Sequence, residues 1–218
     1  KELSAKVGQA SLPTDAEAKR VDTLLGALDR SWIEGAKDTS FANDAAASQR
    51  IQRYILEELK GDTAQITGPG AGDAKSIRVA RNLLRLFKPK LTSVVLQNAD
   101  VAHGSFNAYA EVIRRNDKEI GLLWDAIQAD PELRDTTSVF VLPEFGRDAD
   151  LNQRNGLDHG DGSEDLGKVF CIAAGPDFKQ GKTITKAVDS VDVCPTAAAL
   201  LGCEAPLAQG KVMKAILA

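Results

Sequence analysis

Apolar residues recur every three or four positions in four stretches of the chain, which is the spacing of one face of an α-helix. These stretches cover residues 16–33, 45–59, 76–87 and 106–127. The fourth is the longest, and its apolar stripe runs from Tyr109 to Ile127. A further helix is expected over 190–201, because Gly202 follows it as a C-terminal stop. Glycines and a proline between 61 and 72 indicate a loop.

Continuous apolar runs predict three buried strands, and they cover residues 91–96, 136–142 and 167–174. Polar loops follow the first two strands, over 97–104 and 144–163. Strands that alternate with helices predict an α/β fold with a mostly parallel sheet flanked by helices. We therefore divide the chain into a helical segment, 1–90, which packs on the core, and an α/β region, 91–218.

Composition and charge narrow the classes of protein to which this chain can belong. The chain has 218 residues, of which 43% are hydrophobic and 27% charged, and this is ordinary for a globular domain. The formal net charge of −4 and the mixing of both signs argue against a nucleic-acid partner. No apolar stretch approaches the roughly 20 residues that a transmembrane helix needs. Because residue 1 is Lys, and no signal peptide follows it, we expect a processed or trimmed chain whose targeting segment lies upstream.

Three cysteines are present, and they show no metal-binding spacing. Cys171 and Cys194 lie in apolar runs and are interpreted as small buried hydrophobic residues. A disulfide from either of them to Cys203 stays open at this point.

Both histidines of the chain, His103 and His159, fall in the polar loops that follow the first two strands. Asp100 precedes His103 by three residues, and Asp158 directly precedes His159. Loops after the carboxyl ends of parallel strands carry the ligands of such sheets, so we expect these side chains to converge. Nitrogen and oxygen ligands of this kind suit a divalent metal, with zinc first and manganese or calcium as alternatives. The competing interpretation is that both histidines are ordinary surface residues.

Further polar residues surround this predicted site. Glu144 directly follows the second strand and its Pro143, where a side chain would point out of the end of the sheet as a further ligand. Arg147 is predicted to bind an anionic substrate with its planar, two-pronged guanidinium group. Taken singly, Glu144 is equally explained as a solvated residue and Arg147 as a surface ion-pair partner. Asp158 is expected to orient His159 by a hydrogen bond.

These residues stand in an order that resembles the C-terminal half of the alkaline phosphatase/sulfatase superfamily. The motifs that carry the resemblance are Asp100-x-x-His103, Asp117-x-x-Ile120-Gly121, Glu144-Phe145-Gly146-Arg147 and Asp158-His159-Gly160, with closing segments 191–196 and 200–202. The resemblance covers roughly residues 91–203. Together with residues 173–176 and Gly181, the motifs are most similar to an uncharacterised, often exported bacterial sulfatase-like branch.

The resemblance implies a metal-dependent hydrolase of phosphate or sulfate esters that acts on a small anionic ester in the periplasm or outside the cell. Asp100, His103 and His159 correspond to the ligands of one metal, and Glu144 to a carboxylate ligand of the second. Phe145 stands where the superfamily has a histidine ligand. The second metal site would then be empty, weaker, or rebuilt with oxygen ligands such as Asp148 or Asp161.

The superfamily places its nucleophile and one metal-binding aspartate on an early strand. Residues 1–90 contain no apolar strand that ends in Asp, so we expect the fold to be incomplete without an N-terminal half. A second polypeptide or N-terminal fragment would then supply the missing strands. The alternative is a non-catalytic structural or binding protein that retains the fold and at most one metal site.

Overall fold

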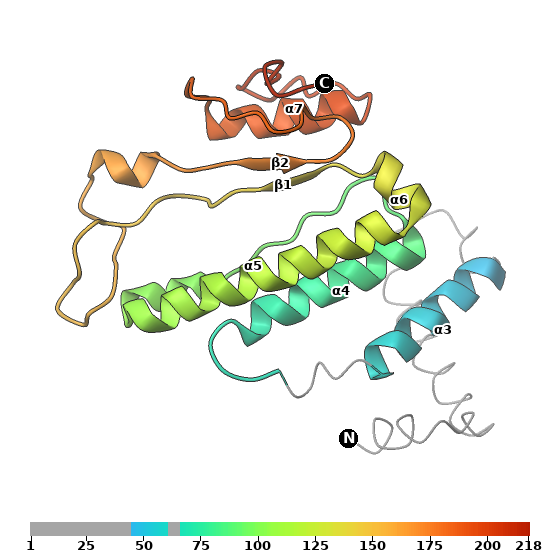
Figure 1. Cartoon of the computed structure of the whole chain (residues 1–218), viewed down its shortest axis with the longest axis horizontal. Helices are drawn as coiled ribbons and strands as arrows, with labels where there is room; N and C mark the ends of the chain where they lie inside the picture. Colours follow the sequence, from blue (N-terminus) through green and yellow to red (C-terminus); the bar gives the residue numbers. More distant parts are fainter. Residues whose placement is uncertain (1–44, 61–65) are drawn as a thin grey trace. The chain divides into compact units, whose positions relative to one another are not determined.

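The computed structural model describes residues 45–60 and 66–218, so the predicted helix over 16–33 lies outside the described residues. The elements are α3 (Ala45–Lys60), α4 (Ala71–Phe87), η3 (Asn98–His103), α5 (Phe106–Ala129), α6 (Pro131–Thr136), β1 (Val139–Val141), η4 (Glu164–Gly167), β2 (Ile172–Ala174), η5 (Ser190–Asp192) and α7 (Val193–Leu200) (Figure 1). They fall into two compact units. The described residues of the first are 45–60, 66–67 and 78–89, and those of the second are 68–77 and 90–218.

The first unit pairs α3 with the end of α4. The rings of Tyr54 and Phe87 meet edge to face with centroids 6.1 Å apart, and Asn82 Nδ2 donates a hydrogen bond of 2.7 Å to Glu58 Oε1. The helices predicted over 45–59 and 76–87 are confirmed, although α4 begins five residues earlier than predicted, at Ala71.

The prediction of an α/β fold with a mostly parallel sheet is wrong. Among the described residues the sheet has two strands, β1 and β2, which run antiparallel with Phe140 opposite Ala173. A parallel pair needs a long crossover connection, usually a helix, whereas an antiparallel pair does not. Residues 142–171, which join the two strands, contain only the 3₁₀ turn η4.

The strand predicted over 91–96 does not form. This segment has no regular secondary structure, and its backbone takes part in no hydrogen bond within the described part of the chain. Leu91 is 68% exposed and Val95 is 72% exposed. A strand is stable only where a neighbour pairs with its backbone groups, and the described residues offer 91–96 no such neighbour.

Helix α5 forms as predicted over 106–127 and extends to Ala129. Its N-cap is Ser105, whose side chain accepts a hydrogen bond of 3.2 Å from the Ala108 amide. Val112 and Ile127 of the predicted apolar stripe are buried. Helix α6, which follows directly, was not predicted from the periodicity. It is capped by Asp130, whose carboxylate accepts from two backbone amides.

A buried polar network fixes the start of η3 in the second unit. The Asp73 carboxylate, 3% exposed, accepts hydrogen bonds from the amides of Gln97 and Asn98 at 2.9 and 3.0 Å. It also accepts one of 2.8 Å from Asn116 Nδ2 on α5. The Asn98 side chain in turn accepts from the Asp73 amide at 3.0 Å. The first turn of α4 therefore sets the position of η3, which carries Asp100 and His103.

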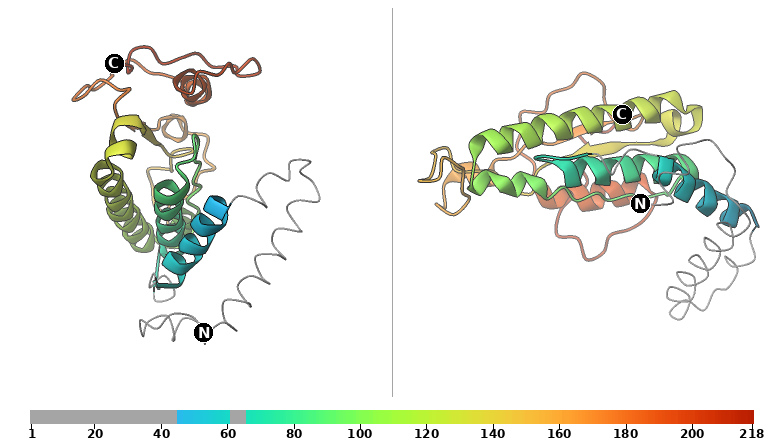
Figure 2. Two further views of the ribbon diagram at one scale, coloured as in Figure 1. Left: turned by 90° about the vertical axis from the view of Figure 1, so that its right-hand side faces the viewer. Right: turned by 90° about the horizontal axis from the view of Figure 1, so that it is seen from below.

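The predicted helix over 190–201 appears as η5 followed by α7, and it ends at Gly202, whose φ of +69° suits glycine. The chain after α7 returns along it, as Figures 1 and 2 show. There the buried Thr196 hydroxyl accepts from the Met213 amide at 2.9 Å, and Asp192 Oδ1 accepts from the Lys211 amide at 2.8 Å. These bonds anchor the C-terminal segment.

The cysteines are more exposed than the sequence predicts. Cys171 and Cys194, which were expected to be buried, are exposed, as is Cys203. All three thiols are free, so none of the disulfides that the sequence left open is formed. Each of the two apolar runs that contain Cys171 and Cys194 has a face turned to solvent.

Candidate metal centre

Asp100, His103 and His159 come together, as the sequence predicts. One ligand atom from each of these three side chains lies within 4.8 Å of the other two. Asp100 and His103 are both on η3, and residues three apart in a 3₁₀-helix stand on the same side of it. Asp100 Oδ1 therefore lies 3.2 Å from His103 Nε2.

His159, the third member of this group, lies beside the other two because the loop that precedes it packs on η3. The Leu157 amide donates to the Ala102 carbonyl at 2.8 Å, and the Phe106 amide donates to the Asn155 carbonyl at 2.8 Å. Asn152 Nδ2 adds a hydrogen bond of 3.1 Å to the His103 carbonyl. These bonds bring the ring of His159 to the ring of His103, with centroids 4.8 Å apart.

Gly156 makes this close packing possible. It is buried, and a Cβ at this position would collide with the carbonyl oxygens of Ala102 and His103. The preceding Asn155 has a φ of +57°, in the left-handed region that asparagine tolerates better than most residues. Any side chain at residue 156 would therefore push the loop away from η3.

Asp158 binds His103 rather than His159, which corrects the prediction that it would orient His159. Its Oδ1 atom lies 2.7 Å from His103 Nδ1. This hydrogen bond and a second one from Asn152 lower the pKa of the Asp158 carboxyl below its usual value. With the proton of His103 on Nδ1, facing Asp158, the lone pair of this ring is on Nε2, which is then the nitrogen that can bind a metal.

Arg147 lies against the same ligand atoms. Its Nη1 atom is 3.3 Å from His103 Nε2, and its Nη2 atom is 3.4 Å from Asp100 Oδ1. The guanidinium group also donates to the carbonyls of Leu157 and Ala99, at 3.2 and 3.4 Å. Only 12% of the Arg147 side chain is exposed, compared with 71% for Asp100. A positive charge therefore stands beside the candidate metal ligands.

Phe145 stands at the position where the resembled superfamily has a histidine ligand. Its ring packs against His159. Its ring centroid lies 4.6 Å from that of His159. The Cζ atom of Arg147 lies 6.0 Å from the same phenyl ring, at the outer limit of a cation–π contact. Phe145 therefore restricts the positions that the imidazole of His159 can take.

The residues predicted for a second metal do not assemble. Glu144 is exposed and lies outside the ligand group, and in the described part of the chain no second set of three such side chains converges. Asp148 donates its amide to the Asp158 carbonyl at 3.0 Å. Asp161 accepts a hydrogen bond of 2.7 Å from the Ser163 amide, which lowers the pKa of the Asp161 carboxyl.

Asp73 and Asn152 position the centre, but the sequence did not identify either of them as a site residue. Asp73 follows a glycine-rich loop, as many helix-capping residues do, but nothing local reveals its bonds to η3. Asn152 opens an Asn-x-x-Asn-Gly stretch that signals a turn, yet its bond to His103 spans 49 residues. Long-range contacts of this kind leave no periodic signal.

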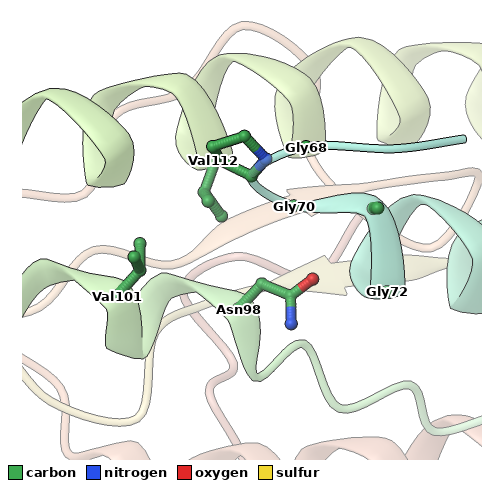
Figure 3. A pocket seen from close by; sticks show the side chains of 8 residues that line it. Gly68, Gly70, Gly72, Asn98, Val101 and Val112 are labelled. Atoms are coloured by element: carbon green, nitrogen blue, oxygen red, sulfur yellow. The ribbon is translucent and has the colours of Figure 1, made fainter.

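A separate pocket of about 300 Å³ lies beside the Asp73 network (Figure 3). It is lined by Gly68, Pro69, Gly70, Ala71, Gly72, Asn98, Val101 and Val112. None of the predicted site residues lines this pocket, so it is separate from the ligand group.

The donor set suits a divalent transition metal. Two imidazole nitrogens and one carboxylate oxygen are common zinc ligands, and three protein ligands leave a coordination position for water or substrate. Comparison of the chain with protein-family models, curated proteins and solved structures finds no match. In the part of the chain that the structure describes, no helix is long and apolar enough to cross a membrane.

Proposed function

We propose that the chain binds one divalent metal through Asp100, His103 and His159, and that this centre serves the hydrolysis of a small phosphate or sulfate ester. The observation that carries the proposal is the convergence of three ligand atoms within 4.8 Å, with Asp158 on the Nδ1 side of His103. A histidine that a carboxylate holds in this way is oriented for metal binding.

Zinc is the proposed metal, and manganese is second. Imidazole nitrogens suit zinc and other transition metals, whereas calcium prefers six to eight oxygen ligands. The described group offers two nitrogens and one carboxylate, so calcium is the least suited of the three metals.

Two features favour hydrolysis over a purely structural metal. Structural zinc sites usually have four protein ligands, whereas catalytic sites keep an open position. The described residues contribute three members to the group, and the Asp100 side chain is 71% exposed in the described structure, so a substrate can approach it. A metal held by Asp100, His103 and His159 would supply Lewis-acid chemistry, either to an ester oxygen or to a bound water. Arg147 supplies a cation beside the group for an anionic ester, in agreement with the resemblance to sulfatases and phosphatases.

A non-catalytic metal-binding protein is the second candidate. The packing of Phe145 on His159 favours this candidate, because a phenyl ring occupies the position where the resembled superfamily has a histidine ligand of the second metal. A metal that binds only the folded state would then stabilise the fold by linkage.

We further propose that a second polypeptide supplies strands to this chain. The exposed apolar residues Leu91 and Val95 belong to a segment that has no backbone hydrogen-bond partner among residues 45–60 and 66–218, and this segment leads directly into η3. Pairing with a strand of another chain would satisfy these backbone groups. Such a chain could also carry the nucleophile that the resemblance requires.

The test is the metal content of the purified protein together with hydrolysis of p-nitrophenyl phosphate and p-nitrophenyl sulfate, before and after chelation. We expect about one metal per chain, which His159→Ala removes. Retention of the metal by His159→Ala would contradict the proposed centre. Metal without hydrolysis, in the protein purified with any chain that accompanies it, would favour the non-catalytic candidate.

A further inference from the structure

Arg147 and a metal ion require the same two atoms of this centre. The lone pair that His103 can offer is on Nε2, because Nδ1 faces Asp158 at 2.7 Å. Arg147 Nη1 approaches that nitrogen to 3.3 Å, and Arg147 Nη2 approaches Asp100 Oδ1 to 3.4 Å. An ion bound to these atoms at the roughly 2.0–2.2 Å of zinc–ligand bonds would stand next to the guanidinium group.

Two cations so close together repel each other strongly when one of them is shielded from water. Arg147 is 12% exposed, and the carbonyls of Leu157 and Ala99 hold its guanidinium group in place. Arginine keeps its charge at all accessible pH values, so it cannot relieve the repulsion by losing a proton.

We infer that Arg147 is a built-in competitor of the metal, and that a tetrahedral oxyanion relieves this competition by drawing the guanidinium group away from Asp100 and His103. This inference rests on the proposed metal centre and adds a regulation to it. Sulfate and phosphate oxygens match the two-pronged donor geometry of arginine. Because coupling between two ligands is reciprocal, the oxyanion tightens metal binding and the metal tightens oxyanion binding. The centre would then take up metal and anionic ester together.

The experiment measures the affinity of the protein for Co²⁺, a spectroscopic substitute for zinc, in sodium sulfate and in sodium chloride of equal ionic strength. For the wild type we expect an affinity at least threefold higher in sulfate. We expect Arg147→Met to bind Co²⁺ about tenfold more tightly than the wild type in chloride, and to show no difference between the two salts.

Arg154→Met is the matched control. Arg154 lies 3.5 Å from Asp158 Oδ1 and is 65% exposed, and no hydrogen bond joins it to Asp100 or His103 Nε2. Its removal subtracts the same charge from the same neighbourhood, and we expect a change in Co²⁺ affinity of less than threefold. An equal gain in both variants would overturn the inference, because a general charge effect would then explain it.

The outcomes also separate this inference from the proposed function. Equal Co²⁺ affinity in wild type and Arg147→Met overturns the competition but leaves the metal centre intact. No Co²⁺ binding in either protein overturns the metal centre itself. If Arg147→Met does not fold, the comparison of sulfate with chloride in the wild type decides alone, and equal affinities in the two salts reject the inference.

Discussion

The Oδ1 atom of Asp158 lies 2.7 Å from Nδ1 of His103, across 55 residues of sequence. This contact fixes which nitrogen of His103 faces Asp100, and it joins the two segments that form the candidate metal centre. The strength of metal binding should therefore depend on Asp158, although Asp158 is not a member of the ligand group.

Substitution of Asp158 by Ala should weaken zinc binding by about 10- to 100-fold, the usual cost of losing a hydrogen-bond partner of a histidine ligand. Asp158→Asn keeps an acceptor oxygen and should lose less. The measurement is competition for zinc with a chromophoric chelator. Asp161→Asn is the control, and we expect it to bind zinc as the wild type does. A large loss in the control would instead assign Asp161 to the centre, as the sequence allowed.

Substitution of Gly156 by Ala should destabilise the protein by about 1–3 kcal/mol, the usual cost of overpacking a close contact. The added methyl group would meet the carbonyl oxygens of Ala102 and His103 and push His159 away from His103. Urea denaturation and zinc titration should therefore both change. Gly160→Ala is the matched control, because a Cβ at Gly160 has no neighbour within 4 Å. Equal stability of the two variants would refute the packing argument.

Substitution of Asp73 by Ala should cost about 3 kcal/mol, because it removes a buried carboxylate that accepts hydrogen bonds from the amides of Gln97 and Asn98 and from the buried side chain of Asn116. Urea denaturation measures this loss. The exposed Asp117 on α5 is the control, and Asp117→Ala should change stability by less than about 0.5 kcal/mol. If Asp73→Ala were as stable as the control, the polar network would not be what fixes η3.

Substitution of Val95 by Asp should abolish association with a strand-supplying partner while leaving the stability of this chain within about 0.5 kcal/mol, since Val95 is 72% exposed. Size-exclusion chromatography of the natively purified protein measures the association. Leu207→Asp, at a position that is 95% exposed, controls for the added charge. Persistence of the complex in Val95→Asp would place the partner elsewhere.

The helices could be predicted because the pattern that specifies them is local. The apolar stripe of α5 repeats every turn, and the boundaries of α3 and α5 follow from it within two residues. The start of α4 was placed too late because Gly70 and Gly72 suggest a loop, whereas Asp73 ties the first turn of the helix to η3. That bond spans 24 residues and leaves no trace in a local window.

The sheet could not be predicted for the same reason. Apolar runs indicate strands but do not specify their neighbours, and the run over 91–96 has no backbone partner in the part of the chain that is described. The two histidines do lie close together, as expected, but the expected edge of a parallel sheet does not bring them together. The 3₁₀ turn of η3 and the packing of Gly156 against Ala102 do so instead.

The candidate centre joins Asp100 and His103 to side chains more than 40 residues later in the chain. Contacts between such distant residues require the intervening chain to close a loop, which costs entropy, so we expect them to form after the folding transition state. A metal held by these side chains would stabilise the native state more than the folding transition state. Added zinc should then slow unfolding and leave the refolding rate nearly unchanged, so that the lifetime of the native protein, and not its rate of formation, depends on the supply of metal.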